Sequence, residues 1–242
     1  LWQREGPGHS FQLLITDVWH TCRELRLPVV YVEVSMHVLM INSSPHQKGC
    51  TNRALEEIAS VLQEKGIESE ILWIGKESLH GCIDCGYCFK HGVCVFNDDK
   101  VNEAAGKALA SDALILGSPV HYASIAGAAS AFLDRLFRIV SKRMYLKPGA
   151  SVVSCRRGGA SASFDQLNKY FTISGMPVVS STYWNSVHGN SPSEVEQDLE
   201  GLQVMRNLGA NLAWLLHCIE AGRQAGLAAP EAERRFVTNY IR

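Results

Sequence analysis

Four cysteines lie close together near the middle of the chain and form the pattern C-x2-C-x2-C-x5-C. They are Cys82, Cys85, Cys88 and Cys94. Cysteine thiolates bind iron–sulfur clusters and zinc, and free thiols take part in redox reactions. The regular spacing of the first three favours a cluster, because one short loop can wrap around it and point each sulfur inward. The fourth cysteine would then complete the ligand set within the same loop.

Zinc and free thiols remain open as alternatives for this cysteine motif. Four thiolates satisfy tetrahedral zinc, although structural zinc sites more often separate two C-x2-C pairs by a longer loop. His80 precedes the motif and His91 lies between its last two cysteines, and either could replace a cysteine as a ligand. Disulfide stapling of the secreted type is not expected, because a chain of 242 residues can bury a core without it and the other cysteines are scattered.

The composition of the chain limits its partners. With 242 residues, of which 46% are hydrophobic, one domain with a full core is the simplest expectation. A formal net charge of -1 gives no electrostatic attraction to nucleic acid or to an anionic membrane surface. No apolar run approaches the roughly 18 residues of a membrane span. We therefore expect a cytoplasmic protein with small-molecule or protein partners, and neither nucleic acid nor membrane as a partner.

Short apolar runs and amphipathic helices alternate along the chain after residue 35. The expected strands cover residues 37–42, 67–74, 113–117, 150–155 and 176–183. The expected helices cover residues 51–65, 100–111, 125–141, 163–174 and, as a long final helix, 192–219. This alternation predicts an α/β fold in which a doubly wound, five-stranded parallel sheet carries a cysteine-rich loop insertion. Ligands of such sheets bind at the carboxyl ends of the strands.

The chain divides into three parts by its pattern. Met36 stands just before the first convincing strand, and the region upstream shows no clear period. We assign residues 1–35 to an N-terminal extension, residues 36–228 to the α/β domain and residues 229–242 to a C-terminal tail. Two interpretations of the extension remain open: a segment that precedes the biological start at Met36, or a helix and a strand that pack on the domain.

The loop after the first strand has the composition of a phosphate site. Residues 43–51 combine two serines, a lysine, a glycine and a threonine, and they lead directly into a helix whose first amides can bind an anion. The loop has neither the G-x-G-x-x-G nor the Walker pattern, so a monophosphate is favoured over a dinucleotide or a nucleoside triphosphate. An ordinary turn with a helix cap is the alternative interpretation.

Two further loops leave the same expected edge of the sheet. In residues 117–124, Pro119 stiffens a turn, and His121 and Tyr122 could cover a planar ring, although an aromatic residue after a strand often only packs. In residues 154–159, two glycines permit close approach of the backbone, and two arginines could bind a phosphate or a ring carbonyl, or simply face solvent.

Taken together, these motifs resemble the NAD(P)H-dependent FMN reductase family, and more narrowly its iron–sulfur flavoprotein branch. The resemblance is carried by residues 44–51, residues 117–122, the stretch Phe132-Leu133-Asp134-Arg135 and the cysteine motif. It covers roughly residues 36–190. It implies a flavodoxin-like fold with strand order 2-1-3-4-5, FMN at the switch point of the sheet, and commonly a homodimer that completes the flavin site.

The resemblance also assigns residues to each part of the site. For the FMN phosphate it implies Ser44, His46, Cys50 and Thr51, with Lys48 supplying charge. For the isoalloxazine it implies Pro119, Val120, His121 and Tyr122, with Arg157, Gly158 and Gly159 at the other edge. For a [4Fe-4S] cluster it implies Cys82, Cys85, Cys88 and Cys94. Many relatives have arginine at position 46 and asparagine at position 50, so those two contacts depart from the family pattern.

The function implied is an FMN-dependent NAD(P)H oxidoreductase. The flavin N5 would accept hydride from NAD(P)H, and electrons would pass to a small-molecule or protein acceptor, through the cluster if one is present. Because the flavin carries the chemistry, no side chain is expected to act as acid, base or nucleophile. The alternative is an electron carrier that ferredoxin-like partners reduce without any nicotinamide. A redox-sensing or zinc-binding cysteine loop is a third hypothesis. Trp214 and Leu216, off the main apolar face of the final helix, are a candidate dimer surface.

Overall fold

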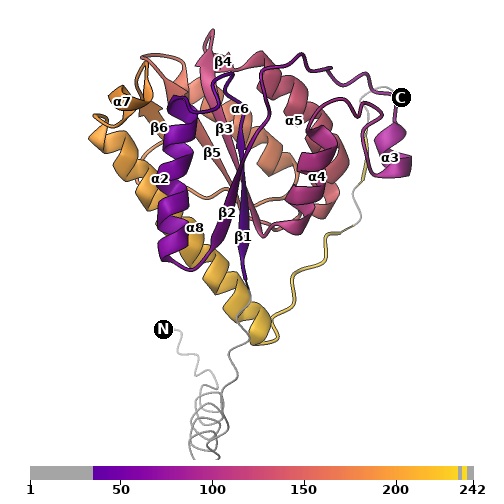
Figure 1. Ribbon diagram of the computed structural model, residues 1–242. Coiled ribbons are helices and arrows are strands. Elements are labelled where there is room, and N and C mark those ends of the chain that lie inside the picture. The colour runs from indigo at the N-terminus through magenta and orange to yellow at the C-terminus, as the bar shows by residue number, and fades with distance from the viewer. Residues whose placement is uncertain (1–34, 234–235, 239–242) are drawn as a thin grey trace, which may run out of the picture. The chain divides into compact units, whose positions relative to one another are not determined.

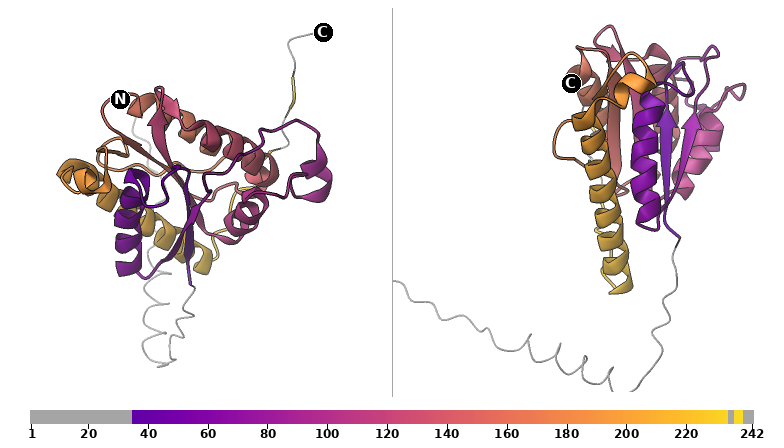
Figure 2. Two further views of the ribbon diagram at one scale, coloured as in Figure 1. Left: turned by 45° about the horizontal axis from the view of Figure 1, so that its top comes forward. Right: turned by 60° about the vertical axis from the view of Figure 1, so that its left-hand side comes forward.

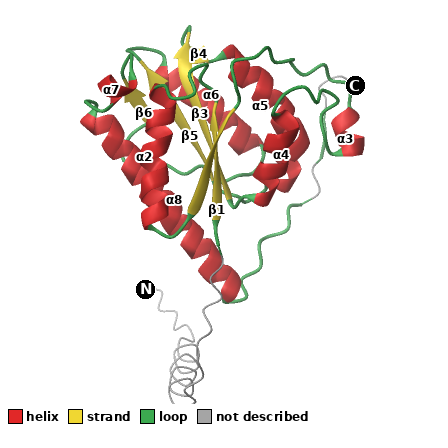
Figure 3. Ribbon diagram, in the orientation of Figure 1, coloured by secondary structure: helices red, strands yellow, loops and turns green. Residues whose placement is uncertain are grey.

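The computed structural model describes residues 35–233 and 236–238 (Figure 1). Residues 1–34, which make up nearly all of the predicted N-terminal extension, lie outside this part. Within it, helices cover both faces of a single sheet (Figure 3). No helix in the described ranges has both the length and the apolar composition that a membrane crossing requires.

The sheet has the predicted order. Its parallel strands are β1 (His37–Asn42), β2 (Glu68–Trp73), β3 (Ala113–His121), β5 (Gly149–Cys155) and β6 (Ser186–His188). They are arranged β2-β1-β3-β5-β6, and every neighbouring pair is parallel. The two-residue strand β4 (Ser124–Ile125) pairs antiparallel with the end of β3 and lies off this path. The five parallel strands therefore confirm the doubly wound, flavodoxin-like order 2-1-3-4-5.

The helices form two layers. The longer ones are α2 (Cys50–Glu64), α4 (Val101–Ala110), α5 (Gly127–Val140), α6 (Ala160–Ile173) and α8 (Leu199–Gln224). The shorter ones are α3 (Tyr87–His91), the 3-10 turn η1 (Ser141–Arg143) and α7 (Pro192–Val195). Helices α2 and α8 pack side by side on one face of the sheet (Figure 2), and α4, α5 and α6 cover the other.

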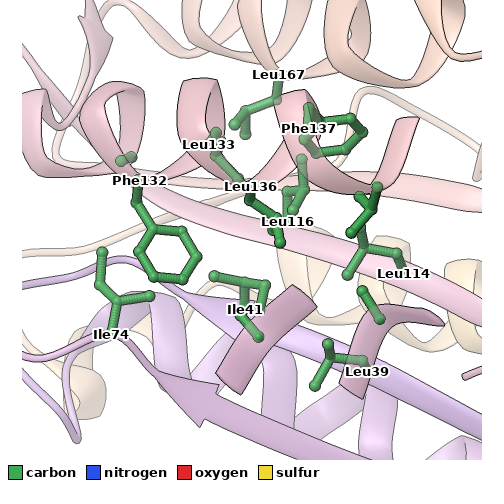
Figure 4. Packing of buried hydrophobic residues seen from close by; sticks show 14 of the residues in the cluster. Leu39, Ile41, Ile74, Leu114, Leu116, Phe132, Leu133, Leu136, Phe137 and Leu167 are labelled. Carbon is green, nitrogen blue, oxygen red and sulfur yellow. The ribbon is translucent and has the colours of Figure 1, made fainter. Parts of the chain in front are cut away.

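The central strands supply both hydrophobic cores because successive side chains of a strand point to opposite faces. Val38 and Met40 of β1 pack toward α2 and α8, whereas Leu39 and Ile41 pack toward Phe132 and its neighbours on α5 (Figure 4). Strand β3 alternates in the same way. Burial on both faces explains why these strands are continuous apolar runs in the sequence.

The predicted fifth strand, residues 176–183, is wrong. The strand on that side of the sheet is β6, and residues 176–183 contribute only an isolated bridge between Gly149 and Val178. Pro177 has no amide hydrogen to donate, and the segment then turns onto α8, where Asn211 Nδ2 donates to Ser180 O at 2.8 Å. Residues 176–183 therefore form an irregular segment packed on the domain and not a strand.

The predicted long final helix is two helices. Proline 192 does begin a helix, α7, but the chain leaves helical geometry and Asp198 caps a new one by accepting from Gly201 N at 2.9 Å. Leu199, at the start of α8, is 74% exposed. Leu216, expected off the main apolar face of the final helix, is 3% exposed and belongs to the core, whereas Trp214 is 69% exposed.

A charged network supports the contact between α2 and α8. Glu57 accepts from Arg53 on its own helix at 2.8 Å and from Arg206 of α8 at 2.5 Å. Burial tends to raise the pKa of Glu57, but the hydrogen bonds from Arg206 and Arg53 outweigh it, so the pKa lies below its usual value. A carboxyl with a lowered native pKa stabilises the fold above its unfolded-state pKa and loses this contribution as the pH falls.

We expect Glu57→Gln to lower the free energy of unfolding by about 0.5 kcal/mol at pH 7, a value reduced for solvent screening. The difference should shrink as the pH falls below about 4.5, because the wild-type carboxyl becomes protonated first in the unfolded state and, at still lower pH, in the native state as well. Urea denaturation at pH 7 and at pH 3.5 measures the difference in free energy of unfolding between the variant and wild type. Glu64→Gln, an exposed change near the end of α2, serves as the control. A loss for Glu57→Gln that is as large at pH 3.5 as at pH 7 would contradict this account.

Candidate functional site

Three loops meet at the carboxyl edge of the sheet. Ser43, in the loop after β1, donates from its backbone amide to Gly117 O of β3 at 3.0 Å. Thr51, in the first turn of α2, shares a hydrogen bond of 2.8 Å with the Ser154 hydroxyl of β5. Figure 1 shows the start of α2 and the β3–β4 hairpin at the same edge. The structure therefore brings together the loops that follow three adjacent strands.

Asn42, the last residue of β1, organises the first loop. Its Nδ2 donates to Gln47 O at 3.1 Å, and its Oδ1 accepts from Ser44 N at 3.0 Å. The Ser44 hydroxyl in turn accepts from His46 N at 3.1 Å. Analysis of the sequence missed this role of Asn42, although a fully buried asparagine that ends an apolar strand is a usable signal. The bonds close the loop into a compact ring.

The closed loop presents the start of α2 to solvent. Gly49 is the N-cap residue and has no side chain to cap the first amides of the helix, which have no intrahelical acceptor. A Cβ at Gly49 would lie 2.9 Å from His46 Cβ, so glycine is required for this tight turn. His46 and Lys48 are exposed beside these amides. Free amides at the start of a helix, beside a lysine and a histidine, are the kind of surface that can bind an anion.

The other predicted phosphate residues have different surroundings. Ser44 is buried, and its hydroxyl is already used within the loop. The buried Thr51 hydroxyl faces Ser154 under the loop. Cys50 is half-buried, with its sulfur 3.6 Å from Gly189 O, and burial raises the pKa of this thiol. Ser44, Cys50 and Thr51 therefore support the loop from the interior. Of the five predicted phosphate residues, only His46 and Lys48 are exposed.

The β3–β4 hairpin forms a second wall. His121 pairs with Ser124, and the two residues between them, Tyr122 and Ala123, have φ values of 50° and 57°. Positive φ values at both central residues are typical of a type I′ turn. This conformation is unfavourable when neither residue is glycine. Tyr122 is fully exposed at its tip, and Pro119 and Val120 are half-buried at its base. The strained turn places an aromatic ring above the edge of the sheet.

The loop after β5 packs directly against this hairpin. Gly159 has a φ of +89°, and a Cβ there would lie 2.7 Å from Ala123 Cα and 2.8 Å from Val120 Cγ1. Arg157 and Gly158 are exposed beside it, and nothing lies within 4 Å of the position of a Gly158 Cβ. The two predicted ring-binding segments are therefore in contact, and Gly159 is a point of close approach between them.

We expect Gly159→Ala to lower the free energy of unfolding by about 2 kcal/mol, because alanine meets both the backbone of the hairpin and an unfavourable φ. Gly158→Ala, one residue earlier in open space, should change it by no more than about 0.5 kcal/mol. Chemical denaturation of both variants measures the contrast. Equal stability of the two variants would show that the loop and hairpin are not in tight contact.

The four cysteines line one small cavity beside α5. Cys82 and Cys85 are exposed, whereas Cys88 and Cys94 are half-buried. Figures 1 and 2 show helix α3, which carries Cys88, on the opposite side of the domain from α7. Gly86 and Gly92 flank α3 in the left-handed conformation, which lets the chain turn sharply around the cavity. The structure therefore confirms a cysteine-rich loop insertion after β2.

The metal-binding side chains near this cavity differ in position. In residues 35–233 and 236–238, no three cysteine, histidine or acidic side chains converge as ligands of one metal ion. His80 stacks on Phe96 at 4.3 Å and His91 on Tyr87 at 4.1 Å, and neither lines the cavity. The possible metal ligands that line the cavity are the four cysteines and Asp84, and Asp84 pairs with Arg138.

Two arginines of α5 complete the cavity. The Arg135 side chain is 1% exposed, pairs with Asp99 and donates through Nε to Cys94 Sγ at 3.2 Å. Burial alone would lower the pKa of Arg135. The hydrogen bonds to Asp99 and Cys94 outweigh this effect, so the pKa lies above its usual value. Arg138 is 39% exposed, pairs with Asp84 and lies over the Phe89 ring. The sequence placed Arg135 in a motif without indicating this contact.

A tryptophan connects the phosphate loop with the end of the cysteine loop. Trp73, the last residue of β2, donates through Nε1 to Ser44 O at 2.8 Å. Lys100, which precedes α4, donates to Trp73 O at 2.8 Å, and its neighbour Asp99 binds Arg135. The two parts of the site therefore belong to one hydrogen-bonded framework.

Fold and site together define a flavodoxin-like protein, and comparison with solved structures agrees. RosB, solved with 8-demethyl-8-formylriboflavin-5'-phosphate, superposes with a TM-score of 0.62 at 16% identity, covering 86% of this chain and 93% of that one. An NAD(P)H:quinone oxidoreductase from Methanothermobacter marburgensis gives 0.56 at 16% identity, covering 74% of this chain and 96% of that one. At such identities the likeness concerns the fold alone.

The chain belongs to the NADPH-dependent FMN reductase family, whose model matches residues 36–191. It is therefore placed among flavin oxidoreductases. An iron-sulfur flavoprotein of Methanocaldococcus jannaschii is 30% identical over 193 residues, covering 76% of this chain and 100% of that protein. An iron-sulfur flavoprotein of Methanosarcina thermophila is 26% identical over 192 residues, covering 78% of this chain and 99% of that protein.

Proposed function

We propose that this protein is an FMN-dependent oxidoreductase that takes electrons from NAD(P)H and passes them through a [4Fe-4S] cluster to a small-molecule or protein acceptor. The observation that carries the proposal is the joining of a phosphate loop and a four-cysteine cavity in one framework through Trp73. Family membership supports FMN, and the likeness to iron-sulfur flavoproteins supports the cluster.

Each wall of the site has a task in this proposal. His46, Lys48 and the first amides of α2 would bind the FMN phosphate, and the hairpin at Tyr122 would cover the isoalloxazine. The exposed backbone at Gly158 leaves room for the ring edge beside Arg157. When bound, FMN supplies the redox chemistry by accepting hydride at N5. The protein itself binds the ring, orients it and limits the access of water.

The setting of the protein forms part of the same proposal. Thiolate ligands require a reducing compartment, which supports a cytoplasmic location. We propose a homodimer, supported by the exposed Trp214 on α8 and by the exposed pair of Tyr183 and Trp184, whose rings lie 5.1 Å apart. Large exposed aromatic side chains are typical of protein interfaces.

We expect Lys48→Glu to weaken FMN affinity about tenfold, because it places a negative charge next to the bound phosphate. Riboflavin, which lacks the phosphate, should bind both forms equally well. Lys65→Glu, at the other end of α2, should leave both affinities unchanged. Flavin fluorescence titration measures all of them. An equal loss for FMN and riboflavin would place the phosphate elsewhere.

The electron donor is tested by mixing the FMN-loaded protein with NADH or NADPH without oxygen. Rapid bleaching of the flavin supports the proposal, and the absence of reduction by either nucleotide rejects it. Reduction by a reduced ferredoxin alone would favour the alternative of an electron carrier independent of nicotinamide.

In the same assay, we expect Cys85→Ala to retain flavin binding and reduction by NAD(P)H but to lose electron transfer to a one-electron protein acceptor. Cys218→Ala, at an exposed cysteine of α8, is the matched control and should behave as wild type. The visible spectrum shows whether the cluster absorption is lost in only the first variant. Unchanged one-electron transfer in Cys85→Ala would remove the cysteine loop from the electron path.

A further inference from the structure

Arg135 is the most deeply buried charged side chain beside the cysteine cavity. Its guanidinium is 1% exposed and makes an ion pair with Asp99, which is itself 7% exposed. Further bonds of 3.3 Å run from it to His80 O and to Phe96 O, and its charge lies 5.1 Å from the centre of the Phe96 ring. One side chain thus holds the cysteine loop at points on both sides of Cys94.

Its Nε–H is directed at a cysteine sulfur. The distance from Nε to Cys94 Sγ is 3.2 Å. The backbone of Cys94 is fixed as well, because its amide donates to Asn102 Oδ1 at 2.7 Å and its carbonyl accepts from Asn102 Nδ2 at 3.2 Å. Cys82 and Cys85, by contrast, lie on the exposed part of the loop. Cys94 is therefore held by side chains of α4 and α5 at its backbone and at its sulfur.

A hydrogen bond to a ligand sulfur alters the redox properties of an iron–sulfur cluster. Reduction adds negative charge, which an N–H group pointing at the thiolate stabilises, so such bonds raise the reduction potential. Asp99 balances the positive charge of Arg135. The directed Nε–H group, rather than the net charge, is therefore what distinguishes Cys94 from the other cysteines.

We propose that Arg135 is a positioning residue for the cysteine site, which holds Cys94 as the anchoring ligand and makes the bound cluster easier to reduce. This inference rests on the proposed function, because it requires a cluster on the four cysteines. Arg135 would then set how readily electrons move from the flavin into the cluster.

Arg138 offers a matched comparison on the same helix. It also lines the cavity, but it is 39% exposed and pairs with Asp84, whose side chain is 78% exposed. Among the described residues, Arg138 donates to Asp84 and makes no hydrogen bond to a cysteine sulfur. Loss of a guanidinium from the cavity wall can thus be separated from loss of the bond to sulfur.

The test is a redox titration of the cluster in the anaerobically loaded protein, followed by its visible and electron paramagnetic resonance spectra. Arg135→Lys keeps a charge for Asp99 but has no donor at the Nε position. We expect the ratio of reduced to oxidised cluster at a fixed solution potential to fall about tenfold in this variant. Arg138→Lys should match wild type.

A second variant protects the test against misfolding. Arg135→Met combined with Asp99→Asn removes both charges of the buried pair, so no unpartnered charge remains in the core. It should show the same shift to a lower potential. Thermal unfolding and iron and sulfide content are measured on every variant to compare fully loaded, folded protein.

The outcomes separate the two levels of the argument. Wild-type potentials in both Arg135 variants, or an equal shift in Arg138→Lys, would overturn the role of Arg135 while leaving the proposed function intact. A wild-type protein that binds FMN but takes up no iron and sulfide would reject the cluster in the proposed function, and this inference with it.

Discussion

Burial of the parallel sheet on both faces is the constraint on which the rest of the structure depends. Strands β1, β3 and β5 are covered by helices on either side, so their interior positions must be apolar or small. The larger polar side chain of Asn42 lies where its strand ends, whereas the strand interiors admit only small polar residues such as Ser151. The chemistry of the molecule is therefore concentrated in the loops at one edge, where chain segments distant in sequence meet.

This constraint explains which parts of the fold could be predicted. The strand at residues 37–42 follows from an apolar run that precedes an amphipathic helix, whereas the strand order was implied by the family resemblance. The last strand could not be placed in this way. Residues 176–179 are as apolar as a strand and do bond to Gly149 of β5, but residues 180–182 bond instead to side chains and backbone of α8, which are contacts distant in sequence.

The candidate site, too, has parts that could be predicted from the sequence and parts that could not. The spacing of the four cysteines was enough to predict that they share one cavity, since residues three apart in a short loop have little freedom to separate. The roles of Asn42 and Arg135 could not be predicted, because each depends on partners that the fold alone brings near. The direction of a side chain in a predicted loop, such as that of Thr51 toward Ser154, is equally hidden.

The buried contact between Arg135 and Cys94 also has an evolutionary consequence. Arg135 lies on α5, Asn102 on α4 and Asp99 in the turn before α4, yet all three serve the cysteine loop. A descendant that lost the cysteines would keep a guanidinium and a carboxylate in the interior with nothing for them to organise, and apolar residues could replace the pair without loss of stability. These three positions should therefore be inherited and lost together with the cysteines, as one unit within the wider family.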